Sequence, residues 1–322
     1  MGLEFQIGQL WGIVLAAGEG TRVRTFLSEL CGGRGIKQFC SILGGRSMLQ
    51  RTLDRVECLI PRKRILLVVS RYHSEEVAAQ LSDWPAENVI FQPENCDTTA
   101  GILLPLAYIS HRDPLATVAI FPSDHFILHE QRFMESVRHG IWETQRFPWN
   151  LTLLGVLPDC PEDGYGWIMP GTEEGDRGTR AVRGFWEKPT PSQAQELWQQ
   201  GALWNTFVCI AQSGTLWSMA RRTVPEIYER FRPIRQALGT PQVEEAVKQA
   251  YTAMPIVNFC AGLCEPLAAE LRVLPVSSVG WSDWGTAERI LETCKQLGKY
   301  GELMARLNQR SGRRDSLALQ AS

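Results

Sequence analysis

The chain has 322 residues, of which 44% are hydrophobic and 21% charged, and its formal net charge is -2. This length predicts one large α/β domain or two smaller ones. The composition excludes a mainly disordered, fibrous or collagen-like chain. A near-neutral charge argues against a broad nucleic-acid surface, which needs clustered cations, but it leaves room for a small phosphorylated ligand.

No apolar run is long enough to span a bilayer, since the best candidate is the short stretch 10–17. The N-terminus also lacks the basic start of a secretory signal. The nine cysteines are an odd number without a Cys-x-x-Cys pair, which predicts reduced, mostly buried thiols. Cys260 and Cys264 could share a helix face, but no partner ligands cluster near them. We therefore expect a cytoplasmic protein that engages neither membrane nor nucleic acid.

Strand-like and helix-like segments alternate along the first half. The predicted strands cover 12–16, 65–69, 89–91, 117–121 and 151–156. The predicted helices cover 48–59, 75–81 with Ser74 as N-cap, 98–110 and 131–144. This alternation predicts an α/β fold with a Rossmann-like, mainly parallel sheet, flanked by helices and joined by right-handed crossovers.

The second half begins with a turn-rich, acidic segment, 158–178, which is expected to insert between sheet strands and form part of a smaller lobe. Further strands are predicted over 181–187, 206–211 and 271–275. Further helices are predicted over 213–222, 225–232, 241–250 and 285–297. The tail 309–322 is basic and then small and polar, so it is expected to be loosely ordered.

Ligands of parallel sheets bind outside the carboxyl ends of the strands, so the turn after the first strand is a candidate site. Its residues Ala17, Gly18 and Gly20 let the backbone approach a phosphate, and Thr21 and Arg22 add a hydroxyl and a fork-shaped cation. A tight turn with solvated arginines is the structural alternative. Dinucleotide binding is disfavoured because Val23 replaces a third glycine, and no Gly-Lys-Ser/Thr of a P-loop follows.

Three more charged residues could act near that turn. Lys37 lies in a short loop and could return to the phosphates as a point charge, or it could simply be a surface lysine. Asp124 follows the strand 117–121, where a carboxylate is a natural ligand for Mg²⁺. Asp283, in the turn 280–285, is a second acid whose alternative role is to cap the helix that follows. Only the fold can bring these acids together.

A further group of residues suits a sugar phosphate. Glu187 and Lys188 end a strand and could hold sugar hydroxyls and a phosphate. Asn205 could bind a hydroxyl, and the motif Gly164-Tyr165-Gly166-Trp167, which contains Gly166, could present backbone and aromatic groups to a sugar ring. Each of these residues, taken singly, is more often structural.

The ordered set LAAGEGTR, IKQF, PEN, FPSDH, GYGWI, FWEKP, WNTFV and GWSDWGT, over about residues 11–295, resembles the sugar-phosphate nucleotidyltransferases. It is most similar to the mannose-1-phosphate guanylyltransferases, which form GDP-mannose. The resemblance implies a nucleotide-diphospho-sugar transferase fold. It also implies a single domain over 1–308, with a nucleotide-binding part at about 11–157 and a sugar-binding part at about 158–308.

The resemblance also implies a reaction and roles. Mannose 1-phosphate would attack the α-phosphorus of GTP in line, without a covalent enzyme intermediate, and pyrophosphate would leave. Arg22, Lys37, Asp124 and Asp283 would be catalytic, and the two aspartates would hold Mg²⁺. The other implied site residues are Ala17, Gly18, Gly20, Thr21, Glu94 and Asn95 for the nucleotide, and Gly166, Glu187, Lys188 and Asn205 for the sugar phosphate. A homodimer is a candidate assembly.

Two alternatives stay open. One is a related transferase that uses glucose 1-phosphate with UTP or dTTP, since related enzymes share the glycine loop and the lysine. The other is a non-catalytic subunit that senses sugar nucleotides. It is motivated by two departures from the family pattern: Ile36 stands where the family usually has proline, and Cys96 where it often has arginine. Because the chain ends soon after the Asp283 turn, we expect a stand-alone transferase without the isomerase module of bifunctional members.

Overall fold

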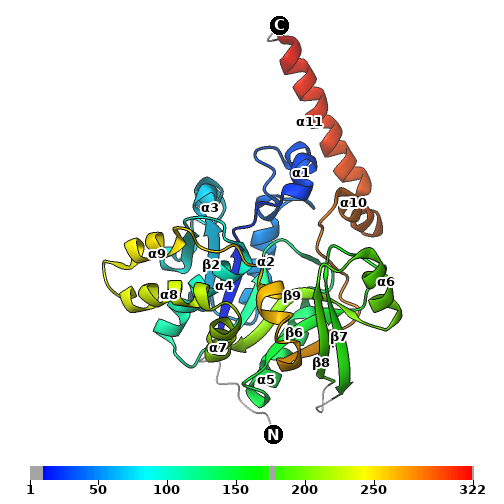
Figure 1. The fold of residues 1–322 in the computed structure, drawn as a ribbon. Coiled ribbons are helices and arrows are strands. Elements are labelled where there is room, and N and C mark those ends of the chain that lie inside the picture. Colours follow the sequence, from blue (N-terminus) through cyan, green and yellow to red (C-terminus); the bar gives the residue numbers. More distant parts are fainter. Residues whose placement is uncertain (1–9, 174–177, 321–322) are drawn as a thin grey trace.

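The computed structural model describes residues 10–173 and 178–320 (Figure 1). Within these residues nine strands form one sheet in the order β3-β2-β1-β4-β9-β6-β10-β8-β7. In chain order the strands are β1 (Leu10–Ala16), β2 (Ile65–Ser70), β3 (Val89–Gln92), β4 (Thr117–Pro122), β6 (Leu151–Val156), β7 (Gly166–Glu173), β8 (Arg180–Glu187), β9 (Leu203–Gln212) and β10 (Leu271–Val276). A separate ribbon pairs β5 (Phe126–Ile127) with β11 (Trp281–Ser282).

The first half of the sheet is parallel, as the sequence predicts. Strand β1 pairs in parallel with β2 and β4, and β2 pairs in parallel with β3. The second half differs, because β9 runs antiparallel to both β4 and β6, and β8 runs antiparallel to β10. The segment 158–178 contributes β7, which pairs with β8 and β9 and so extends the same sheet.

Helices cover both faces of the sheet. Consecutive residues of a strand point to opposite faces, so two neighbours on β1 show which helices cover each face. Ile13 packs in a cluster with α4, α7, α8 and α9, whereas Val14 packs with α2, α3, α5 and α6. The helices are α1 (Arg24–Cys31), α2 (Met48–Glu57), α3 (Ser74–Gln80), α4 (Asp97–Arg112), α5 (Glu130–Arg146), α6 (Pro191–Gln199), α7 (Ser213–Thr223), α8 (Pro225–Ala237), α9 (Val243–Tyr251), α10 (Ala287–Gln296) and α11 (Tyr300–Gln320). No helix in the described part is both long and apolar enough to cross a membrane.

Two local interpretations, the Ser74 cap and the alternative capping role of Asp283, were wrong. Ser74 is the first residue of α3 and not its cap, because the one-turn helix Arg71–His73 runs directly into α3. Thr286, not Asp283, caps α10: its side chain accepts a hydrogen bond from the Arg289 amide at 3.3 Å. Within the tail 309–322, the described residues continue α11 as far as Gln320.

Helix α11 is anchored at its start and then extends away from the body (Figure 1). Leu303 is buried in a third apolar cluster with residues of α1 and α10. Arg306 donates to the carbonyls of Ser41 and Ile42, both at 2.7 Å. These contacts stabilise the first part of α11, since tertiary packing supplies most of the stability of a helix.

Candidate active site

The turn after β1 is shaped by the loop that carries Lys37. Gly20 has a left-handed φ of 57°, and a Cβ there would lie 3.0 Å from the Lys37 Cβ. The buried Gln38 amide donates hydrogen bonds to the carbonyls of Ala16 and Gly18, both at 2.8 Å. These bonds tie two carbonyls of the turn to the Lys37 loop, and backbone N–H groups in a turn of this kind can bind an anion. Gln38 was not among the sequence-predicted site residues.

Lys37 joins three distant segments. Its side chain is only 5% exposed, and its Nζ lies 3.0 Å from the Asp124 Oδ2. The same Nζ donates to the backbone carbonyl of Asp283. A buried ammonium needs such partners, because an unpaired buried charge is costly. The structure thus brings Lys37, Asp124 and Asp283 into one cluster, as the sequence reasoning required.

The topology explains why the two aspartates meet. Strands β1 and β4 are parallel neighbours, with Leu15 opposite Pro122, so the glycine turn and Asp124 leave the sheet side by side. The ribbon then pairs Ser282 with Phe126, which places Asp283 next to the segment 124–125. Asp283 is therefore positioned by the β5–β11 ribbon, whose two strands have only two residues each.

The Asp283 carboxylate is held by three donors. Its Oδ1 accepts from the Tyr165 hydroxyl and from the Gly285 amide, the latter at 2.9 Å. Its Oδ2 lies 3.4 Å from the Arg22 Nη2, on a side chain that is 62% exposed. A Cβ at Gly285 would lie 2.3 Å from this Oδ2, so glycine is required there. Burial and the Asp283 charge raise the pKa of Tyr165, which keeps its hydroxyl a donor.

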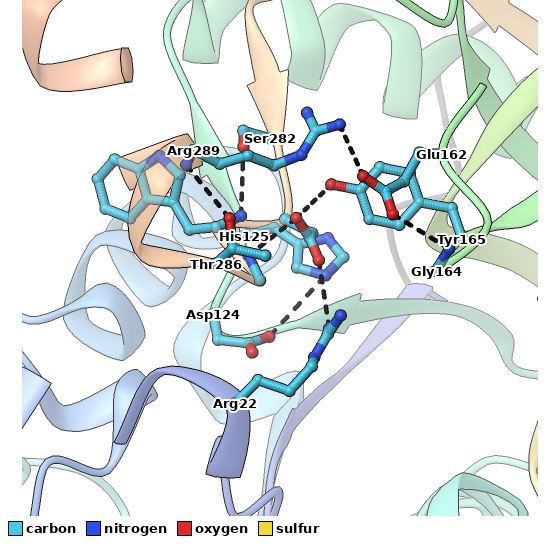
Figure 2. Close-up of polar contacts among 12 residues, drawn as sticks. Arg22, Asp124, His125, Glu162, Gly164, Tyr165, Ser282, Thr286 and Arg289 are labelled. Carbon is cyan, nitrogen blue, oxygen red and sulfur yellow. Dashed lines mark hydrogen bonds and ion pairs between the residues drawn. The ribbon is translucent and has the colours of Figure 1, made fainter. Parts of the chain in front are cut away.

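Asp124 is more open, with a side chain that is 32% exposed. Burial alone would raise its pKa, but the charges of Lys37 and His125 outweigh burial and hold the pKa of Asp124 below its usual range. The His125 Nε2 lies 3.9 Å from the Asp124 Oδ1 (Figure 2). The His125 ring meets the Trp281 ring edge-on, with 5.3 Å between the ring centroids. Asp124 is thus an ionised, accessible carboxylate.

These two acids fit the donor set of Mg²⁺. Mg²⁺ takes oxygen ligands, and it usually binds one or two carboxylates together with substrate phosphates and water. In the described part of the chain, no group of three or more His, Cys, Asp or Glu residues forms an alternative metal cluster. Asp124 and Asp283 are the residues that would hold the ion.

The sequence did not predict the part that Arg289 plays in the site. Arg289 of α10 lies over the rings of both Tyr165 and Trp204, 5.2 Å from each centroid, and pairs with Glu162 at 3.2 Å. Figure 2 shows this arginine reaching across the site toward Glu162. Tyr165 donates a hydrogen bond to Asp283, so the stacking of Arg289 on Tyr165 also helps to hold the Asp283 carboxylate in place. The sequence signal was the motif around Tyr165, whose backbone and aromatic groups were expected to contact a sugar ring and not to support Asp283.

The predicted sugar-phosphate residues also meet. A Cβ at Gly166 would lie 2.8 Å from the Glu187 Oε2 and 3.3 Å from the Asn205 Cβ. Lys188 has a left-handed φ of 50°, and its amide donates to the Tyr165 carbonyl at 3.1 Å. Burial raises the pKa of Glu187. This group therefore adjoins the acid cluster through Tyr165.

Not every predicted residue joins the cluster by a contact. Glu94 forms an exposed ion pair with Arg71 at 2.8 Å, and the Asn95 Oδ1 accepts from the Asp97 amide at 3.2 Å. Neither side chain bonds to the acid cluster within the described residues. Ala17 is half-buried and Thr21 is exposed, and both belong to the turn after β1.

Two curated proteins with the same name are similar to this chain. Mannose-1-phosphate guanylyltransferase ManC of Salmonella typhimurium is 29% identical over 301 residues, which cover 88% of this chain and 59% of that protein. A mannose-1-phosphate guanylyltransferase of Escherichia coli matches to the same extent. The chain thus spans 59% of the length of these curated relatives.

Solved structures show the same fold. A Thermus thermophilus protein described as mannose-1-phosphate geranyltransferase superposes with a TM-score of 0.75 at 26% identity, covering 88% of this chain and 79% of that one. A Helicobacter pylori protein described as mannose-6-phosphate isomerase has a TM-score of 0.66 at 19% identity, covering 85% of this chain and 99% of that one, a likeness of fold alone. A family model described as nucleotidyl transferase matches residues 11–299. These findings confirm the resemblance read from the motifs and the α/β fold, and the chain belongs to the nucleotidyl transferase family.

Proposed function

We propose that this protein forms GDP-mannose and pyrophosphate from GTP and mannose 1-phosphate. The observation that carries the proposal is the cluster of Lys37, Asp124 and Asp283 beside the glycine turn. The names of the relatives support the choice of substrates, since proteins named mannose-1-phosphate guanylyltransferase match along most of this chain.

In this proposal the chain's residues position two polyanions that repel each other. The backbone of the turn and the exposed Arg22 hold the triphosphate. Lys37 provides a buried positive charge where pyrophosphate develops, and being fixed in advance it needs no reorganisation. When bound, Mg²⁺ would offset the negative charge of the phosphates. Asp124 and Asp283 are the acids that would hold it.

The sugar phosphate is held on the other side of Tyr165. Lys188 binds its phosphate, and Glu187, Asn205 and the Gly166 backbone hold the sugar hydroxyls. A phosphate oxygen then faces the α-phosphorus for in-line attack, and positioning supplies much of the rate. No covalent enzyme intermediate is needed.

The test is a matrix of nucleoside triphosphates against sugar 1-phosphates with Mg²⁺, in which pyrophosphate release is measured. We expect the highest turnover with GTP and mannose 1-phosphate. A preference for UTP or dTTP with glucose 1-phosphate would reject the guanylyl assignment. Tight GDP-mannose binding without pyrophosphate release from any pair would instead identify a sensing subunit.

A substitution tests the metal assignment within this proposal. Asp124→Asn keeps the shape of the side chain and removes its charge, so we expect most activity to be lost while thermal unfolding stays nearly unchanged. Unaltered turnover in this variant would refute the metal role of Asp124.

A further inference from the structure

A pocket behind the Lys37 loop holds two thiols. It has a volume of about 570 Å³ and lies between the end of α1, the loop 32–41, α3 and α11. Cys31, the last residue of α1, is half-buried and lines the pocket together with the 4% exposed Cys40. Arg306 and Arg310 of α11 line it as well. All nine cysteines are free thiols in the structure.

Both thiols line this pocket, and both pack in the same apolar cluster, so they lie in one small region of the structure. The interaction with Cys40 lowers the pKa of Cys31, and the charges of Arg306 and Arg310 act in the same direction. The interaction with Cys31 and burial raise the pKa of Cys40. Reactivity follows thiolate character and access, which makes Cys31 the attacking thiol and Cys40 the resolving one.

We propose that Cys31 and Cys40 form a redox-active dithiol, which a low-molecular-weight disulfide oxidises to an intramolecular disulfide. The Cys31 thiolate attacks one sulfur of the small disulfide, forming a mixed disulfide and releasing one small thiolate. Cys40 then loses its proton and attacks the Cys31 sulfur, which releases the second small thiol. The protein loses two protons and two electrons, and the small disulfide takes them up and becomes two thiols. Arg306 and Arg310 suit an oxidant that carries carboxylates, such as glutathione disulfide.

The disulfide would close the loop that carries Lys37 and Gln38. A disulfide needs a sulfur–sulfur distance of about 2.05 Å, shorter than any thiol–thiol contact, so the two ends of the loop must draw together. Lys37 contacts Asp124 and the Asp283 carbonyl, and Gln38 holds two carbonyls of the glycine turn. Movement of the loop therefore disturbs the proposed triphosphate site, a consequence that rests on the proposed function.

The first experiment needs no substrate. The Cys58→Ser variant removes an exposed thiol that would react on its own. After incubation with glutathione disulfide, we expect the intact mass to fall by two hydrogens and a peptide linking Cys31 to Cys40 to appear, both reversed by dithiothreitol. With Cys40→Ser added, the reaction should stop at a glutathione adduct on Cys31. A Cys31 that stays unmodified while Cys58 of the unsubstituted protein reacts fully, or an adduct on Cys31 that Cys40 never resolves, would overturn the proposal.

The second experiment measures the consequence. We expect oxidised Cys58→Ser protein to lose about tenfold in nucleotidyl transfer, the effect of about 1.4 kcal/mol, and to recover on reduction. The matched variant Cys31→Ser/Cys58→Ser should keep its activity under the same oxidation. Full activity in protein shown by mass to carry the disulfide would refute the coupling to the site. If the unsubstituted protein transfers no nucleotide at all, the proposed function fails, and the mass measurement still decides whether the dithiol exists.

Discussion

Replacing Gln38 with methionine should separate the shape of the glycine turn from the stability of the fold. Gln38 is 2% exposed, and its amide makes two 2.8 Å hydrogen bonds, to the carbonyls of Ala16 and Gly18. Methionine has a similar volume and lacks the N–H donors, so the substitution removes the hydrogen bonds and leaves almost no cavity that would destabilise the fold. Each hydrogen bond contributes about 0.5–1.5 kcal/mol net, so the loss is about 1–3 kcal/mol.

Part of that loss should appear in the binding of the nucleotide, because both carbonyls belong to the proposed triphosphate turn. A loss of about 1.4 kcal/mol in binding is a tenfold rise in the Kd of GTP. We expect that rise in a calorimetric titration, with the KM of the sugar phosphate changed much less. Thermal unfolding should fall by a few degrees.

Gln80 offers a matched control, because its amide donates to the Phe39 carbonyl at 2.9 Å and does not touch the turn. Gln80→Met should lower the unfolding temperature and leave the Kd of GTP unchanged. If Gln38→Met also loses stability without losing affinity, then Gln38 supports the fold alone and does not position the turn.

Three further substitutions test other parts of the site. Gly20→Ala forces a left-handed φ of 57° on alanine beside the Lys37 Cβ, and should cost about 1–2 kcal/mol in chemical unfolding; unchanged stability would contradict the strained turn. Gly166→Ala puts a methyl group 2.8 Å from the Glu187 Oε2, so the KM of the sugar phosphate should rise and that of the nucleotide should not; the reverse pattern would reassign this pocket. Glu187→Gln removes a carboxyl whose pKa burial raises above 4.5. The contribution of this carboxyl to stability is complete at low pH and is lost as the pH rises through the raised pKa. Above that pKa, the variant should therefore gain unfolding temperature relative to the unsubstituted protein. If the unfolding temperatures of the two proteins run parallel across the pH range, the raised pKa of Glu187 is refuted.

The parts of the site that are local in the sequence could be predicted. Buried apolar runs ending in Gly18 and in Asp124 marked the carboxyl ends of two parallel strands, and parallel neighbours place such ends together. The sugar-phosphate group was predicted in the same way from strand ends and from the Gly166 motif. These predictions rest on the period and length of apolar runs, which carry over directly to the sheet.

The remainder depends on contacts between distant segments. Asp283 reaches Asp124 through two-residue strands, which are too short to leave a periodic pattern. The antiparallel placement of β9 was missed because a fully buried strand reads as the same apolar run in either direction. Arg289 stacks on Tyr165 from a helix far along the chain, and no local spacing reports such a contact.

The central claim is that Asp124 and Asp283 act with Lys37 on one metal-bound triphosphate. It is tested most directly by pyrophosphate release from GTP and mannose 1-phosphate across a Mg²⁺ titration, with Asp283→Asn measured alongside. We expect turnover that requires Mg²⁺ and both substrates, and that falls at least about 100-fold in the variant while the fold is retained. Turnover that persists without a divalent ion, or that Asp283→Asn leaves unchanged, would contradict the account.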